Sequence, residues 1–537
     1  MTDYRKAGTA ATQADSTWLQ HLARAAALHL EGKTREALQE LERSSPAAAE
    51  QPEWLAARSQ LLMELEQYRE AAVSLRRFVE LRPEDWPAAY NLGVCCERLG
   101  DGPEAVKWFQ RAATLKPDRV EPWVGLGLGL LKLGQVNQAL DALERAVALD
   151  PDNEAAQLGK AVALQLRGQG QAAWDIYEKL LQAKPNLEVA LTNLTILAVQ
   201  AQRVEEAERY ATRLLEICPD SVAGLEGMAF VAFARQDYPT AIRLCRQLLE
   251  RDPDNPVYHY NLGVACQLAG DLEAAARAYQ EAQKRDPQAT DCWVNLATVW
   301  HQLGRTKLAL EAYRQALRLQ PDLLEVKYNV ALLLEQEGQL EEAEQLYAQL
   351  LQQQPDWAEA WFRLGYLQLQ RSDLEPARES FSRCVSLRPD WVEARVNLGL
   401  ILSRLHRGAE ARQMLEKALE IQPTPPEALE ALAQLYLESG DEDRALGLHE
   451  QLLELGRRKP EILYNTALLY QKRGHLARAI ELYREVIGER PDFAEALLNL
   501  GHALYQQGQP EEARRLWGKA LELNPELARE YFAWHQV

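Results

Sequence analysis

The chain of 537 residues is poor in the features of secreted, metal-binding and membrane proteins. Its seven cysteines are an odd number without metal-type spacing, which argues against a disulfide framework or a zinc site. No apolar stretch approaches the roughly eighteen residues that a membrane-spanning helix needs. Residues 1–17 contain no apolar run flanked by basic residues. We therefore expect a cytoplasmic protein with reduced thiols, no signal peptide and no membrane span.

Basic residues are outnumbered by acidic ones. The chain has 60 Lys and Arg against 79 Asp and Glu, which gives a formal net charge of −19 at pH 7. This balance opposes binding to the phosphate backbone of DNA or RNA. Nucleic acid is therefore not an expected partner.

Signatures of catalysis are also missing. The nine histidines form no metal-spaced pair and belong to no Ser or Cys nucleophile motif. Gly125, Gly127 and Gly129 alternate with other residues, but within an expected helix rather than in a phosphate loop between a strand and a helix. The sequence thus predicts a protein that is not an enzyme and holds no metal and no cofactor.

A repeat of 34 residues dominates what is present. Prolines recur at this interval without insertion or deletion, at Pro83, Pro117, Pro151, Pro185, Pro219, Pro253, Pro287, Pro321, Pro355, Pro389 and Pro423. Arg457 takes the next place, and Pro491 and Pro525 resume the series. Alanine recurs at the same interval, at Ala105, Ala139, Ala173, Ala207, Ala241, Ala275, Ala309, Ala343, Ala377, Ala411, Ala445, Ala479 and Ala513. One structural unit is therefore copied along the chain.

The stretch from Ala358 to Trp391 shows what one unit contains. Trp361 and Leu364 lie on one face of a first helix, and Ala377 lies on the inner face of a second helix, where a larger side chain would overpack the contact. Pro389 ends the second helix, because proline disfavours helical geometry in the preceding residue. The next residue, Asp390, is expected to cap the following helix. Such a pair cannot bury its apolar surface alone, so neighbouring pairs must stack into a solenoid.

These features resemble the tetratricopeptide repeat, apart from a glutamine where that family prefers tyrosine. The resemblance rests on Trp361, Leu364, Gly365, Ala377, Phe381 and Pro389, and the exception is Gln368. The resemblance implies an all-α, right-handed superhelical solenoid of about fifteen helix-turn-helix repeats. The units are similar to the repeat superhelix of protein O-linked N-acetylglucosamine transferases, but no catalytic domain accompanies them.

The repeat divides the chain into four segments. We expect disorder in residues 1–17, two divergent repeats in 18–85, thirteen regular repeats in 86–527 and a capping helix in 528–537. In the last segment Tyr531, Phe532 and Trp534 either cover the end of the solenoid or form an exposed docking patch. The first interpretation is preferred, because an open solenoid end needs a cover.

A second stripe of the first helices carries the candidate peptide-binding residues. In the family this stripe lines a concave groove, where a recurring asparagine binds the backbone of an extended peptide. The corresponding amides are Asn91, Asn193, Asn261, Asn295, Asn329, Asn397, Asn465 and Asn499. Aromatic residues precede several of these positions, at Tyr90, Tyr260, Tyr328, Tyr464 and at Phe362, which is followed by Arg363 in place of asparagine. Amides offer a donor and an acceptor, so a row of them suits a peptide backbone.

Each of these residues also has a purely structural interpretation. The asparagines would then stabilise the helix pair, and the tyrosines would be half-buried packing residues. An acidic column precedes the amides, at Asp291, Glu325, Glu359, Glu393, Glu427, Glu461 and Glu495. It fits a basic ligand, but negative charge in the first turn of a helix is also favoured by the helix dipole, and we prefer that explanation.

The sequence therefore predicts a scaffold or adaptor that binds extended segments of other proteins, basic ones among them, in its concave groove. Two alternatives stay open. The chain is either a subunit that presents substrates to a separate enzyme, such as a glycosyltransferase, or an assembly scaffold that acts through its outer surface.

Overall fold

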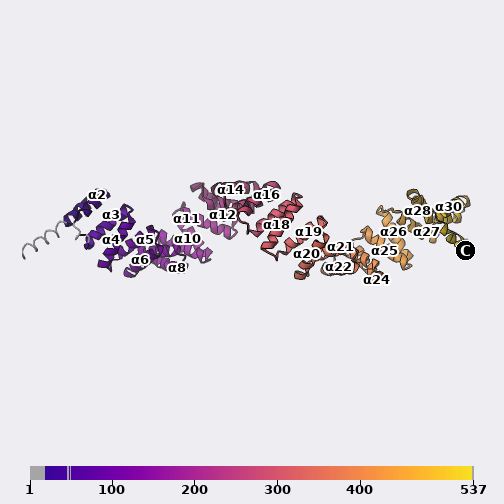
Figure 1. Ribbon diagram of the computed structural model, residues 1–537, viewed down its shortest axis with the longest axis horizontal. Helices are drawn as coiled ribbons and strands as arrows, with labels where there is room; N and C mark the ends of the chain where they lie inside the picture. Colours follow the sequence, from indigo (N-terminus) through magenta and orange to yellow (C-terminus); the bar gives the residue numbers. More distant parts are fainter. Residues whose placement is uncertain (1–17, 45–47, 49, 535–537) are drawn as a thin grey trace, which may run out of the picture. The chain divides into compact units, whose positions relative to one another are not determined.

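The computed structural model describes residues 18–534 apart from 45–47 and 49 (Figure 1). It forms two compact units, residues 1–286 and residues 287–537. The expected disorder of residues 1–17 and the last three residues of the expected capping helix lie outside the described residues. Within those described, all regular secondary structure is helical.

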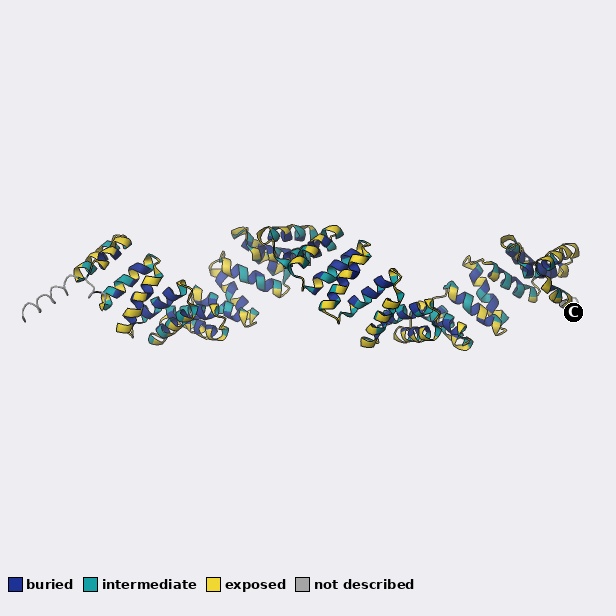
Figure 2. Ribbon diagram, viewed as in Figure 1, coloured by how far each residue is buried: buried dark blue, intermediate teal, exposed yellow. Residues whose placement is uncertain are grey.

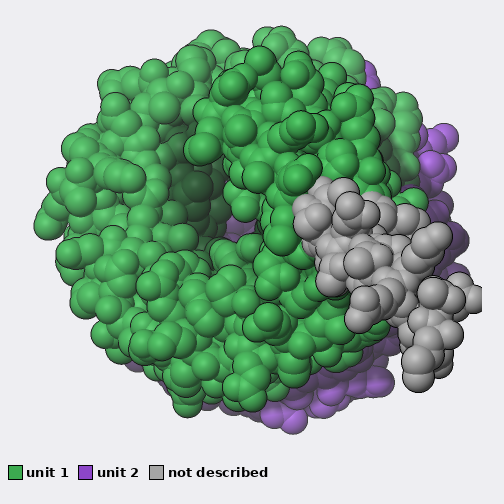
Figure 3. All heavy atoms as spheres, turned by 90° about the vertical axis from the view of Figure 1, so that its left-hand side faces the viewer, with its two compact units in different colours: residues 1–286 green, residues 287–537 purple. Residues whose placement is uncertain are grey.

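Unit 1 is a series of antiparallel helix pairs in chain order, which begins with a helix over residues 18–30. Its further helices are α2 (Thr34–Glu42), α3 (Pro52–Glu64), α4 (Tyr68–Leu81), α5 (Trp86–Arg98), α6 (Gly102–Leu115), α7 (Val120–Lys132), α8 (Val136–Leu149), α9 (Glu154–Leu166), α10 (Gly170–Ala183), α11 (Glu188–Gln200), α12 (Val204–Ile217), α13 (Val222–Ala234), α14 (Tyr238–Arg251), α15 (Pro256–Leu268) and α16 (Leu272–Arg285). Figure 3 shows unit 1 coiled around a hollow.

Unit 2 repeats the same arrangement. Its helices are α17 (Thr290–Gln302), α18 (Thr306–Leu319), α19 (Leu324–Gln336), α20 (Leu340–Gln353), α21 (Ala358–Gln370), α22 (Leu374–Leu387), α23 (Val392–Arg404), α24 (Gly408–Ile421), α25 (Pro426–Glu438), α26 (Glu442–Glu454), α27 (Pro460–Lys472), α28 (Leu476–Glu489), α29 (Ala494–Gln506), α30 (Pro510–Leu523), the 3₁₀ turn η2 (Pro525–Leu527) and α31 (Ala528–Trp534). Each unit is an all-α superhelical solenoid, as the repeat predicts.

The recurring alanine of the second helix is where the helices of a pair meet. Ala377 and Ala411 are fully buried, as are their counterparts in both units, so the predicted packing role is confirmed. Figure 2 shows the buried residues on the sides where neighbouring helices face one another. Glycine serves the same contact on the first helix. A Cβ atom at Gly365 would lie 3.0 Å from the ring of Phe381, which is closer than side chains normally pack.

A hydrogen bond explains why tryptophan and proline recur together. The indole of Trp361 donates to the carbonyl oxygen of Pro355 at 2.9 Å, and Trp293 donates to Pro287 at 3.0 Å. In one repeat that has arginine instead of tryptophan, the side chain makes the same bond. The Nε atom of Arg395 donates to the carbonyl of Pro389 at 2.7 Å. In these repeats the first helix is thereby tied to the end of the preceding unit.

The turn between the two helices of a pair needs a left-handed residue. Glycine usually supplies it, as at Gly338 with φ of +76°, because it has no Cβ atom to clash. Ser372 and His406 occupy the same place with φ of +63° and +58°. These turns carry backbone strain that the glycine turns avoid.

The expected cap by Asp390 is wrong. Asp390 lies in the turn after Pro389, and α23 begins two residues later with Trp391 as its N-cap and no side-chain capping bond. Polar caps occur at the position of Trp391 instead. Asp85 and Asn255 hold this place before α5 and α15, and their side chains accept from backbone N–H groups.

The cysteines belong to the core. Cys96, Cys245, Cys266 and Cys384 are buried and free, as their position in the repeat predicts. Burial raises the pKa of the Cys384 thiol to about 12 and that of Cys245 to about 11. These thiols are therefore neutral at physiological pH and pack as small apolar groups.

At the C-terminal end, Tyr531 of α31 packs edge-on against Trp517, with ring centroids 5.1 Å apart. Phe532 contacts the ring of Tyr531 at 5.3 Å between centroids and is 63% exposed. Tyr531 thus helps to cover the last helix pair, whereas Phe532 faces solvent.

Candidate functional site

The eight predicted asparagines all lie on the first helix of a pair, and each is partly exposed. In unit 1 they belong to α5 (Asn91), α11 (Asn193) and α15 (Asn261), and in unit 2 to α17 (Asn295), α19 (Asn329), α23 (Asn397), α27 (Asn465) and α29 (Asn499). The sequence run Asn261, Asn295 and Asn329 is therefore divided between the units. Asn397 shares a pocket with other candidate residues.

The amides differ in what they bind within the protein. Asn193 donates to the carbonyl of Val189 in its own helix at 2.8 Å, and Asn499 donates to the hydroxyl of Tyr464 at 2.9 Å. Asn329 hydrogen-bonds Tyr313, whose hydroxyl also lies 2.9 Å from that of Thr298. Within the described part of the chain, the amides without a protein partner are those of Asn91, Asn261, Asn397 and Asn465. Only this second group is ready to bind a ligand without first breaking a bond.

Packing interrupts the row of amides in unit 1. Gly125 occupies the asparagine position of α7, and a Cβ atom there would lie 2.8 Å from the ring of Phe109. Gly159 and Gly227 meet Leu143 and Thr195 in the same way. The stacking of neighbouring pairs leaves no room for an amide at these places.

The predicted aromatic residues are partly buried and pack on the second helix of their own pair. Tyr90 lies 5.5 Å from Phe109, Tyr260 lies 5.7 Å from Tyr279 and Tyr464 lies 5.9 Å from Tyr483, measured between ring centroids. Tyr328 and Phe362 make the same contact with Tyr347 and Phe381. The packing interpretation of these rings therefore has direct geometric support, while their exposed edges are available to a ligand.

The same rings also join successive first helices. We call this contact the joint, defined as the meeting of the fifth residue of a first helix with the residue just before the next first helix. At the joint from α19 to α21, Tyr328 stacks on Trp357 at 5.0 Å, and from α21 to α23 Phe362 stacks on Trp391 at 4.6 Å. At the joint from α27 to α29, Tyr464 lies 4.9 Å from Phe493.

Three joints of unit 2 are built differently, and in the one from α17 to α19 the two residues are Val294 and Leu323. From α25 to α27 an ion pair takes the place of the rings, with Lys459 Nζ at 2.9 Å from Glu430 Oε2. From α23 to α25 the corresponding residues are Val396 and Pro425, which are much smaller than a pair of aromatic rings. The joint between α23 and α25 is consequently underfilled.

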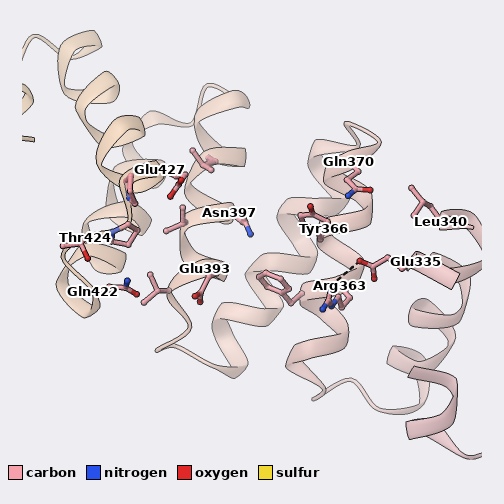
Figure 4. A pocket seen from close by; sticks show the side chains of 16 residues that line it. Glu335, Leu340, Arg363, Tyr366, Gln370, Glu393, Asn397, Gln422, Thr424 and Glu427 are labelled. Atoms are coloured by element: carbon pink, nitrogen blue, oxygen red, sulfur yellow. Dashed lines mark hydrogen bonds and ion pairs between the residues drawn. The ribbon is translucent and has the colours of Figure 1, made fainter. Parts of the chain in front are cut away.

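A pocket of about 800 Å³ opens at this place. It is lined by the first helices α21 and α23, the start of α25 and the loop before it, with contributions from α19 and α20. Of the predicted residues, Phe362, Arg363 and Asn397 line it (Figure 4). Asn397 projects from α23 into the space between α23 and α21. The structure thus brings three sequence-predicted residues together in one concave site.

Arg363 is held inside the pocket by an ion pair. Its Nη1 atom lies 3.3 Å from Glu335 Oε1, and Tyr347 donates a hydrogen bond to the other oxygen of Glu335 at 3.2 Å. Burial disfavours the charge of the guanidinium, but Glu335 and the neighbouring tyrosines more than offset this, so the pKa of Arg363 is raised. The arginine is permanently charged, and its charge is balanced within the protein.

The acidic column is only partly neutralised. All its members lie in the first turn of their helices, where the helix dipole favours them. Arg388 pairs with Glu359 at 2.6 Å, and Arg490 pairs with Glu461 at 2.7 Å. Glu393, which lines the pocket, is exposed and forms no ion pair within the residues that the structure describes.

Sequence reasoning did not single out this pocket or most of its lining. Tyr366, Val396 and Leu400 contribute apolar surface, and Gln370 and Gln422 contribute amides. The available signal was the loss of the aromatic pair at Val396 and Pro425, exactly one repeat after Phe362 and Trp391. A second signal was the proline-rich run Pro423 to Pro426, which forms the loop into α25 and the first residue of that helix.

Other kinds of site find little support. Across the described ranges, no three His, Cys, Asp or Glu side chains are grouped closely enough to hold a metal ion. In the same part of the chain, no helix has both the length and the apolar surface needed to cross a membrane.

Comparison with protein families agrees with the repeat geometry. Tetratricopeptide repeat models match residues 57–120, 227–290, 267–323 and 464–528, residues 392–458, and residues 301–364 and 334–398. A model of the TPR domain of cytochrome c-type biogenesis protein H matches residues 114–223. No curated protein matches the chain.

Several solved structures are similar to the chain in fold. A tetratricopeptide repeat protein from Parabacteroides merdae ATCC 43184 is 17% identical with a TM-score of 0.35, over 46% of this chain and 98% of that one. YrrB, a TPR protein with an unusual peptide-binding site, is 22% identical with a TM-score of 0.32, over 35% and 96%. A chain of the Naa15/Naa10 complex bound to HypK-THB is 15% identical with a TM-score of 0.31, over 96% and 84%.

Proposed function

Because the chain belongs to the tetratricopeptide repeat family, we propose that it is a scaffold that holds extended segments of other proteins on the exposed stripe of its first helices. Families of stacked helix pairs offer extended concave surfaces, and these surfaces suit extended segments of a partner. The protein acts by binding and not by catalysis. The buried, neutral thiols of residues such as Cys384 fit a reducing compartment, so we place it in the cytoplasm.

The observation that carries this proposal is the pocket between α21, α23 and α25. Phe362 and Arg363 come from one repeat and Asn397 from the next, and all three line the same concavity. Its lining combines apolar side chains with amides and carboxylates, the mixture that fixes both the side chains and the backbone of a bound peptide. Asn397 has no hydrogen-bond partner within the described residues, so its amide is free to pair with a peptide group.

Affinity capture with matched amide variants tests the proposal. The wild-type chain is compared with the double variant Asn397→Ala, Asn465→Ala, which removes two amides that have no protein partner. The control is Asn193→Ala, which removes an amide that is already bonded to its own helix. Circular dichroism confirms that all three chains fold. We expect the double variant to lose its partners at least several-fold, and the control to retain them.

The outcomes also separate the alternatives. Equal recovery of the same partners by wild type and double variant contradicts the concave-site proposal and favours binding through the outer surface. Recovery of one enzyme in stoichiometric amount, together with its substrates, identifies a substrate-presenting subunit. In that case the loss of substrates alone from the double variant would still place substrate binding at the first helices.

A further inference from the structure

The underfilled joint between α23 and α25 indicates what the pocket binds. In the two preceding joints, an aromatic ring from each side fills the corresponding space, as Tyr328 and Trp357 do at 5.0 Å. We propose that the pocket accepts an aromatic side chain of an extended partner segment, and that a lysine or arginine follows this aromatic residue in the partner within about two positions. This inference rests on the proposed function and specifies its ligand.

The apolar part of the pocket suits a ring. Phe362 of α21 and Val396 and Leu400 of α23 line it, and Pro425 lines it from the loop before α25. Phe362 already stacks on Trp391 at an interplanar angle of 15°, and its ring is still partly exposed at the pocket. An entering ring therefore meets aliphatic and aromatic surface together. A rigid aromatic residue in a recess of this kind is the usual anchor of a protein interface.

The charge at the pocket selects a basic neighbour. Glu393 is exposed and has no ion pair within the residues described, and Glu427 is 63% exposed with Arg457 as far as 3.8 Å away. The one arginine of the lining, Arg363, is already paired with Glu335. An excess of negative charge remains, and it favours lysine or arginine in the partner while it disfavours acidic residues.

The size and the remaining polar groups point to a peptide rather than an isolated small molecule. The pocket volume of about 800 Å³ exceeds what one ring requires and leaves room for the chain on either side of it. The amides of Asn397, Gln370 and Gln422 are placed around the apolar surface, where they can pair with the peptide backbone.

Selection from a displayed library of random twelve-residue peptides tests the inference on the full chain. The wild type is compared with Val396→Trp, which fills the joint, and with the double variant Glu393→Gln, Glu427→Gln. The matched controls change the same repeat positions elsewhere. Val124→Trp alters the fifth residue of α7, and Glu495→Gln alters the first turn of α29. Circular dichroism and gel filtration establish that each variant is folded.

We expect the wild type to enrich peptides with an aromatic residue followed by lysine or arginine at least tenfold over the unselected library. Val396→Trp abolishes this enrichment, the double Gln variant removes the basic preference but keeps the aromatic one, and both controls behave as wild type. Enriched peptides that lack the aromatic residue, or enrichment that survives Val396→Trp, overturn the inference and leave the proposed function standing. If the wild type enriches no peptide at all, both are contradicted.

Discussion

The ring of Phe362 stacks on the indole of Trp391 with centroids 4.6 Å apart and planes inclined by 15°. One repeat further along the chain, Val396 and Pro425 take their places and line a pocket of about 800 Å³. The same structural position thus serves packing in one joint and leaves a concave site in the next. The pocket is a local departure from the two preceding joints, and such a departure is where specificity is expected in a chain of similar units.

Removal of the stacked ring at a filled joint is expected to weaken that joint. Trp391→Ala removes the stacking on Phe362 and the contact with Arg388, whose guanidinium carbon lies 4.6 Å from the ring centre. We expect a loss of about 1–3 kcal/mol in local stability, from the aromatic pair and from lost burial. Hydrogen exchange of peptides from α21 and α23 measures it. Trp391→Phe should retain most of the protection, and equal loss in both variants would contradict the role of stacking.

Glycine at a strained turn is expected to stabilise its repeat. Ser372 has φ of +63°, in the left-handed region that costs about 1–2 kcal/mol for a residue with a Cβ atom. Glycine removes this cost, but it also increases the conformational entropy of the unfolded chain, which offsets part of the gain. We therefore expect Ser372→Gly to stabilise the folded chain by about 0.5–1 kcal/mol. Gly338→Ala at φ of +76° should destabilise by a similar amount. Chemical denaturation shows the two effects as midpoint shifts of opposite sign, and shifts of the same sign would refute the strain argument.

Acid is expected to destabilise the repeat that contains His449. This side chain is 4% exposed, its Nδ1 atom lies 2.8 Å from the carbonyl oxygen of Ala445, and burial lowers its pKa from the ordinary 6.5. The unfolded chain therefore binds a proton more readily than the folded chain, and stability falls as the pH drops below about 6.5. His449→Phe, which restores the aromatic residue found at Phe381, should remove this part of the acid sensitivity. If the melting temperature of His449→Phe depended on pH as that of the wild type does, the proposed role of His449 in acid sensitivity would be contradicted.

The thiols are expected to differ in reactivity according to burial. Cys218 is partly exposed, whereas Cys384 is buried and its pKa is raised to about 12. Iodoacetamide at pH 8 should modify Cys218 first, while Cys384 reacts only after unfolding. Because the raised pKa favours the neutral thiol in the folded chain, the contribution of Cys384 to stability is present below pH 9.0 and falls as the pH rises toward about 12. Mass spectrometry of the modified peptides measures the reaction rates of the two thiols. Modification of Cys384 at the rate of Cys218 would be inconsistent with a core position for Cys384.

Most of the fold follows from the spacing of residues such as Ala377 and Pro389, because packing between helices of fixed length demands the same residue at each recurrence. The helix start near Asp390 was mispredicted, since the turn after proline takes two further residues before the helix begins. Sequence spacing places a side chain on a face, but it does not determine which groups the side chain binds.

The candidate site shows this limit clearly. Asn397 and Asn499 occupy the same repeat position, yet Asn397 faces the pocket without a protein partner in the described chain while Asn499 donates to Tyr464 at 2.9 Å. The difference depends on whether an aromatic hydroxyl lies within reach in the preceding repeat, and Phe362 does not supply one. Only the comparison of consecutive joints, residue by residue, makes the pocket visible in the sequence.

Site-specific photocrosslinking in cell lysate tests the central claim most directly. A benzophenone amino acid replaces either Tyr366, which lines the pocket, or Glu379, which is exposed on α22 and lies outside it. The account predicts that the probe at Tyr366 captures partner segments containing an aromatic residue close to a lysine or arginine, and that the probe at Glu379 captures few or none. Stronger capture at Glu379, with none at Tyr366, would contradict it.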